Sequence, residues 1–142
     1  MVSETHILPN RYTGKVYIFF NQDEGYEAEY ESNARIYRIP KSGILRTQFK
    51  PNSGWIDSKK YLNFYYEVDD SLIPLNKFIS GRDSLVNLDS NSIVVFEYGT
   101  GIGWEAFGQG EVNTTTYIVD SFKNFNKRDY SLTKDEFDNW NK

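Results

Sequence analysis

The fold is decided around residues 35–49, which read RIYRIPKSGILRTQF. Two runs rich in β-branched and aromatic residues flank the turn sequence Pro40-Lys41-Ser42-Gly43. Pro40 has a fixed φ and no backbone N–H, so it suits the first corner of a turn. Gly43 can adopt the positive φ at which the chain returns. The pattern predicts a β-hairpin.

Runs of the same kind recur along the chain and predict further strands. We expect a central strand at residues 15–20, which are apolar on both faces apart from Lys15. Residues 26–30 alternate between Tyr or Ala and Glu, so they predict an outer strand with one face in water. In the strand expected at residues 61–68, one stripe should face the core: Leu62, Phe64, Tyr66 and Val68.

The later part of the chain adds an edge strand at residues 72–75, because Pro74 cannot donate to a central ladder. Residues 93–98 and 114–119 predict two more strands, separated by a glycine-rich turn region at residues 99–110. Thr133 and Glu136 have the spacing of a capping box, which begins a short helix. That helix should pack Phe137 and Trp140 on the sheet.

These elements predict a mainly β fold in a single domain, residues 1–142. We expect a β-sandwich or open barrel of about seven or eight mostly antiparallel strands with one short C-terminal helix. A chain of 142 residues can bury one core without covalent staples.

Composition excludes several classes of protein. The chain has no cysteine, so disulfides, thiolate metal sites and a cysteine nucleophile are absent. The net charge is −4 and the basic residues are scattered, which argues against a nucleic-acid partner. The longest apolar run, residues 16–20, is far too short to span a membrane.

No motif specifies a reaction. His6 is the single histidine, so a Ser-His-Asp triad or a histidine metal site would have to use it. Gly101 and Gly103 fit a relaxed dinucleotide pattern, but the residues that follow are a poor start for the helix this chemistry requires. We therefore expect no enzyme, cofactor or metal. A carboxylate-dependent hydrolase using Glu97 or Glu105 stays open as an alternative.

Aromatic residues make up 17% of the chain, and tyrosine is the most common of them. Such rings suit β-sheets, and they also suit recognition surfaces. The candidate ligand-binding residues are Trp55, Trp104, Arg35 and Tyr37. The structural alternative makes Arg35, with Arg38 and Arg46, a cross-strand partner of Glu27 and Glu29.

Four segments together resemble a family. They are ETHILP (4–9), YTGKV (12–16), RIYRIPKSGIL (35–45) and GWI (54–56). This set is similar to a bacterial domain of unknown function that is often found in predicted cell-envelope lipoproteins, and the similarity covers about residues 4–68. In such proteins a leader and a lipidated cysteine precede the segment that corresponds to Glu4-Thr5-His6. The resemblance therefore implies an envelope location, with any lipid anchor on residues preceding this sequence.

The leading hypothesis is a non-enzymatic module of the cell envelope that binds a protein or glycan partner. A cytoplasmic protein is the alternative location. An immunity or inhibitor protein that binds a basic partner is the second hypothesis, because the chain is small and acidic. The carboxylate hydrolase is the third.

Overall fold

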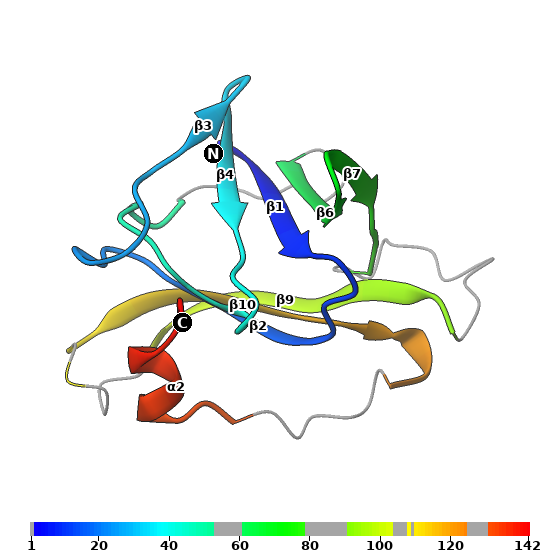
Figure 1. The fold of residues 1–142 in the computed structure, drawn as a ribbon. Helices are drawn as coiled ribbons and strands as arrows, with labels where there is room; N and C mark the ends of the chain where they lie inside the picture. The colour runs from blue at the N-terminus through cyan, green and yellow to red at the C-terminus, as the bar shows by residue number, and fades with distance from the viewer. Residues whose placement is uncertain (1, 53–60, 79–90, 104–107, 109, 125–130) are drawn as a thin grey trace.

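Two five-stranded sheets pack face to face in the computed structural model (Figure 1). It describes residues 2–52, 61–78, 91–103, 108, 110–124 and 131–142. The strands of one sheet run steeply across those of the other in Figure 1, and the core lies between them.

The first sheet has the order β3-β4-β1-β6-β7. Its strands are β1 (Ser3–Pro9), β3 (Tyr30–Glu31), β4 (Ala34–Arg38), β6 (Leu62–Val68) and β7 (Ser71–Pro74). The central strand β1 is parallel to both of its neighbours, β4 and β6. The N-terminal segment therefore lies in the middle of this sheet.

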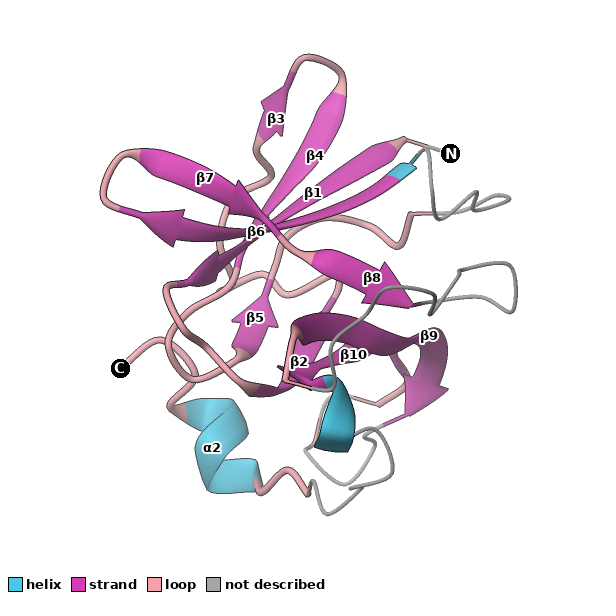
Figure 2. Ribbon diagram, turned by 90° about the vertical axis from the view of Figure 1, so that its right-hand side faces the viewer, coloured by secondary structure: helices cyan, strands magenta, loops and turns pink. Residues whose placement is uncertain are grey.

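The second sheet has the order β5-β2-β10-β9-β8. Its strands are β2 (Gly14–Phe19), β5 (Ile44–Arg46), β8 (Asn76–Phe78), β9 (Ile93–Gly103) and β10 (Val112–Ser121). The long antiparallel pair β9–β10 forms most of it. Figure 2 shows the edge strand β8 beside β9.

The prediction of a mainly β, sandwich-like fold with a short C-terminal helix is confirmed. Ten strands are described instead of about eight, and four of the eight strand pairings are parallel. The chain passes from β1 to β2 and from β4 to β5, and each of these steps changes sheet. The two strands of each such step are not hairpin partners, and parallel pairing of non-consecutive strands becomes available.

The predicted hairpin at residues 35–49 is wrong, although its turn is present. The Gly43 N–H donates to the Pro40 carbonyl at 2.9 Å, and Gly43 has φ +78°. However, β4 lies in the first sheet and β5 in the second. The turn is a crossover that carries the chain from one sheet to the other. The predicted turn at Pro40–Gly43 is therefore present, but the two strands that flank it do not pair with each other.

Other strand predictions are confirmed in part. The predicted central strand is β2, which lies between β5 and β10, and β7 is an edge strand as Pro74 indicated. Residues 26–30 do not form the predicted outer strand, since Tyr26 makes an isolated bridge and pairing begins at Tyr30. The expected glycine-rich turn is also shorter than predicted, because β9 continues to Gly103.

The helix α2 (Lys134–Asp138) explains why β2 is apolar on both faces. Thr133 and Glu136 form the predicted capping box. The Phe137 ring meets the Phe19 ring edge-on at 4.9 Å, and Phe137 and Trp140 are both buried. In Figure 1, α2 lies below the second sheet, on the side away from the first. One face of β2 thus contacts the helix and the other contacts the core between the sheets.

The crossover provides a test of the fold. A Cβ on Gly43 would overlap the Tyr12 hydroxyl and lie 2.9 Å from the Lys15 carbonyl oxygen, at a φ that side chains rarely adopt. We expect Gly43→Ala to lower the free energy of unfolding by about 2 kcal/mol, measured by urea denaturation. The control is Gly99→Ala, where a Cβ would meet nothing within 4 Å. Equal losses in the two variants would contradict this role of the crossover.

Candidate functional site

A bulge in β9 decides which of its side chains face the first sheet. The register between β9 and β10 shifts between Thr116 and Ile118, and Glu97 has φ +55°. Glu97 and Tyr98 together oppose the single residue Tyr117. Because a one-residue shift exchanges the two faces of a strand, Tyr98, Thr100 and Ile102 line the interior space beyond the bulge.

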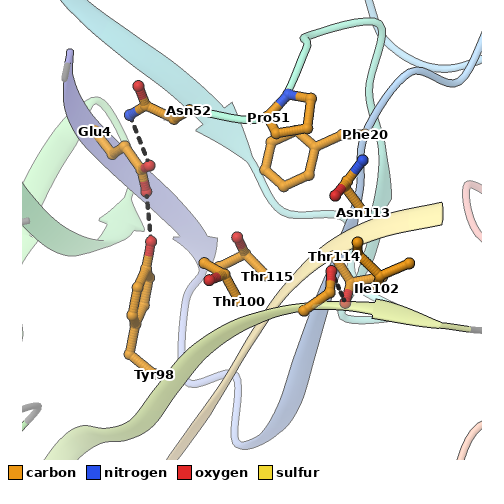
Figure 3. Close-up of a pocket in the computed structure, with 11 residues that line it drawn as sticks. Glu4, Phe20, Pro51, Asn52, Tyr98, Thr100, Ile102, Asn113, Thr114 and Thr115 are labelled. Carbon is orange, nitrogen blue, oxygen red and sulfur yellow. Dashed lines mark hydrogen bonds between the residues drawn. The ribbon is translucent and has the colours of Figure 1, made fainter. Parts of the chain in front are cut away.

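These residues border a pocket of about 220 Å³ between the two sheets (Figure 3). It is lined by side chains of β1, β9 and β10, together with Phe20 and residues 51–52. In Figure 3, Glu4, Asn52 and Tyr98 lie at one side and Phe20 and Asn113 at the other. The exposed residues Thr100 and Ile102 form a rim toward solvent.

Glu4 is the charged residue that lines this pocket, and it is almost wholly buried, at 1% exposure. Its Oε1 accepts a hydrogen bond from His6 Nε2 at 2.8 Å and one from the Tyr98 hydroxyl at 3.3 Å. Its Oε2 accepts from Asn52 Nδ2 at 2.9 Å. Three donors from β1, β9 and the segment after β5 therefore converge on one carboxylate.

These donors determine the charge of Glu4. Burial by itself raises the pKa of this carboxyl, but the hydrogen bond and the charge interaction with His6, helped by Asn52 and Tyr98, lower it below its ordinary value. Burial and the negative charge of Glu4 raise the pKa values of Tyr98 and Tyr117 well above normal. At neutral pH the pocket is therefore lined by a carboxylate that accepts and by the Tyr98 hydroxyl, which keeps its proton.

His6 connects the carboxylate to the opposite sheet. Its ring is fully buried, and Nδ1 lies 3.0 Å from the Tyr117 hydroxyl on β10. The ring stacks on Phe64 with centroids 4.6 Å apart and lies 4.9 Å from the Tyr37 ring. Its orientation is thus held by aromatic packing as well as by hydrogen bonds.

Two of the predicted ligand-binding residues stand behind the pocket. Arg35 and Tyr37 are 8% and 1% exposed. Arg35 Nη1 donates to the Tyr37 hydroxyl at 3.1 Å and to the Lys50 carbonyl at 2.6 Å, and its guanidinium lies over the Phe49 ring. The Tyr37 ring contacts Phe20 edge-on at 6.1 Å, and Phe20 lines the pocket. The other two predicted residues, Trp55 and Trp104, lie outside the described residues.

The structural alternative for the arginines holds for one of them. Arg38 makes two hydrogen bonds to the Glu29 carboxylate, at 3.0 and 2.9 Å. This pair borders a second, shallower hollow between Tyr26 and the crossover. The Arg38 and Glu29 side chains of this hollow are half exposed, whereas Glu4 is buried. Arg46 instead bonds to Gln22 and lies over the Phe137 ring.

Sequence reasoning missed most of the pocket. Glu4, His6 and Leu8 share one face of a strand by two-residue alternation, so the sequence places Glu4 beside His6. That alternation was the available signal for the Glu4–His6 pair. Tyr98, Thr100 and Asn113 had no such signal, because their inward direction depends on the bulge and on the pairing of β9 with β10.

Other motifs take simple structural roles. Gly101 and Gly103 lie within β9, so the dinucleotide pattern does not precede a helix. Within the described ranges, no three His, Asp or Glu side chains come together as a metal site would need. No described helix has the length and apolar character needed to cross a membrane.

Comparisons with known proteins agree with this fold. The profile of a family of unknown function, DUF6843, matches residues 1–72, which include β1 and the Glu4–His6 pair. A crystal structure described as a "Putative Lipoprotein from Bacillus anthracis" superposes with a TM-score of 0.58 at 12% identity. The match covers 93% of this chain and 81% of that chain, and it concerns the fold alone. None of the curated proteins matches the sequence.

The buried carboxylate predicts a pH-dependent stability. The folded-state pKa of Glu4 is lowered, so its stabilisation is complete above the normal value of 4.5 and is lost as the pH falls through the folded value. We expect Glu4→Gln to cost about 3 kcal/mol at pH 7 in urea unfolding. The difference from the unmodified protein should shrink as the pH falls below 4.5.

The matched control is Glu29→Gln. The pKa of Glu29 is also lowered, first by its hydrogen bond with Arg38, but both side chains are half exposed. We expect this variant to cost less than about 1 kcal/mol. A Glu4→Gln penalty that stayed constant between pH 7 and pH 3 would contradict an ionised Glu4.

Proposed function

The chain belongs to the family of unknown function DUF6843, and from this premise we propose that it is a non-enzymatic binding module of the bacterial cell envelope. Its binding site is the pocket beside Glu4. The observation that carries the proposal is an ionised carboxylate buried in a pocket that opens to solvent. Burying a charge is costly, and a fold that needed Glu4 only for packing could replace it with an apolar side chain.

Pocket-lining polar side chains that lack a hydrogen-bond partner among the described residues support the same proposal. The described residues give no partner to the side-chain amide of Asn113 or to the Thr100 hydroxyl, and both line the pocket. Glu4 Oε2 accepts one hydrogen bond, and a carboxylate oxygen can accept two. Polar groups that converge on a pocket in this way fix the orientation of a ligand.

Binding is favoured over hydrolysis by the number of carboxylates. A glycosidase uses two carboxyl groups on opposite sides of the scissile bond. Glu4 is the single carboxylate among the described residues that line the pocket. Glu97 occupies the bulge and does not line the pocket, and Glu105 lies outside the described residues.

The envelope location rests on fold similarity. The crystal structure that superposes on this chain is described as that of a lipoprotein, and a lipoprotein is held at a membrane by lipid attached outside its folded domain. We propose the same arrangement here, with the domain displaying its pocket at the envelope.

We also propose roles for the four residues predicted from the sequence. Trp55 and Trp104 lie outside the described residues, and we propose them as ligand contacts from the sequence alone. Arg35 and Tyr37 are buried, and we assign them to support of the pocket wall through Phe20.

The pocket can be tested with mixed probes before its ligand is identified. We expect ¹H–¹⁵N NMR titration with simple sugars, primary amines, carboxylates and inorganic phosphate to shift the amides of residues 98–102 and 113–115 for at least one probe class. Thr100→Trp should abolish these shifts by filling the pocket from its exposed rim. Replacing Trp55 and Trp104 together by Ala should weaken them without changing the melting temperature.

The control is Ser71→Trp, which adds the same ring at an exposed position of β7 outside the pocket. It should leave the probe shifts unchanged. If no probe class shifts the pocket amides, the pocket is not the binding site.

The location has its own test. Produced from its native gene in the parent bacterium, the protein should fractionate with the envelope. Recovery together with a cytoplasmic marker enzyme would contradict the envelope assignment and would leave the pocket proposal intact.

A further inference from the structure

The size of the pocket limits its occupant. Drug-sized ligands fill pockets of about 300–1,000 Å³, whereas this one holds about 220 Å³. The space suits one small ring. Since Thr100 and Ile102 at the rim are exposed, a longer molecule could continue outward from that ring into solvent.

The hydrogen-bonding groups around the pocket are of mixed type. The Glu4 carboxylate can only accept, and one of its oxygens has a single donor. The Asn113 amide offers two donors and one acceptor, and the Thr100 hydroxyl can do either. A complementary ligand must donate toward Glu4 and accept from the Asn113 amide, and it can do either toward the Thr100 hydroxyl.

Charged ligands do not meet this requirement. An anion such as phosphate or a carboxylate accepts only and would face the negative charge of Glu4. An ammonium group donates only, so it would leave the Asn113 donors unpaired as it removed them from water. A hydroxyl group both donates and accepts, and several hydroxyls on one ring can satisfy all three groups.

Apolar side chains also line the pocket. Phe20, Pro51 and Ile102 line the pocket beside the polar groups. A sugar ring has C–H faces that can lie against such walls while its hydroxyls point to the polar side. Neither a simple amine nor an inorganic ion has such a face.

We infer that the pocket binds one uncharged sugar ring, with Glu4 accepting from its hydroxyls and Asn113 donating to them. This inference rests on the proposed binding function and narrows its ligand class. The same ring chemistry can come from a free monosaccharide or from the end of a glycan chain.

The test is a ¹H–¹⁵N NMR titration of the full chain with separate probes. The sugar probes are glucose, galactose, N-acetylglucosamine and its β-1,4-linked trimer, and the amine probe is ethanolamine. We expect at least one sugar to shift the amides of Thr100, Asn113 and Thr115. Binding of the trimer with higher affinity than the monomer would identify a glycan end as the source, and equal affinities would identify a free sugar.

Variants then identify the contacting groups. Asn113→Leu removes the amide with little change in size, and we expect about tenfold weaker sugar binding. Thr116→Val is the control, because Thr116 lies on the same strand and does not line the pocket. Comparable melting temperatures for the two variants would show that lost binding is not lost folding.

The outcomes separate this inference from the proposed function. Ethanolamine shifts at the pocket without sugar shifts would overturn the sugar inference and leave the pocket as a binding site. Sugar shifts confined to other residues, or unchanged affinity in Asn113→Leu, would also overturn it. Absence of pocket shifts with every probe class would overturn both.

Discussion

The structure depends on a hydrogen-bonded chain that joins its two sheets through the core. Glu4 and His6 lie on β1 of the first sheet, and the partners Tyr98 and Tyr117 lie on β9 and β10 of the second. Inside a protein such bonds are stronger than in water, and an unpaired member is expensive. These bonds favour one relative position of the sheets, because sliding one sheet across the other would break the Tyr98–Glu4 and Tyr117–His6 hydrogen bonds.

The bulge at Glu97 turns this arrangement into a site. If the strand kept Glu97 but had no bulge, regular alternation would aim Glu97 inward and send Tyr98 and Thr100 to the opposite face. Tyr98 then could not reach Glu4, and the pocket would lose the Thr100 rim. The bulge thus gives the second sheet a polar inner end beyond its apolar core, and this end lines the pocket.

The pKa shifts around the pocket run opposite to those that a general acid or base needs. Its carboxylate is surrounded by donors that keep it ionised, and the tyrosine hydroxyls near it hold their protons more tightly than usual. A general acid or base works best with a pKa near the operating pH, and these shifts move in the opposite directions. Arg35 and Tyr37 form a separate hydrogen-bonded pair behind the pocket wall, where the Tyr37 ring contacts Phe20.

The sequence by itself determined the fold class, the edge position of β7, the central place of β2 and the capped C-terminal helix. These features follow from two-residue alternation, proline chemistry and a capping box, all of which are local. Only the tertiary structure decided which strands pair, that residues 35–49 cross between sheets, and that Glu4 meets Tyr98. The turn at Pro40–Gly43 has the same local chemistry in a hairpin or a crossover. A bulge cannot be recognised from the alternation of side chains in one strand, because it is defined by the register with the partner strand. Contacts between residues far apart in sequence decide which strands pair and which side chains face the interior, and short-range patterns do not encode these contacts.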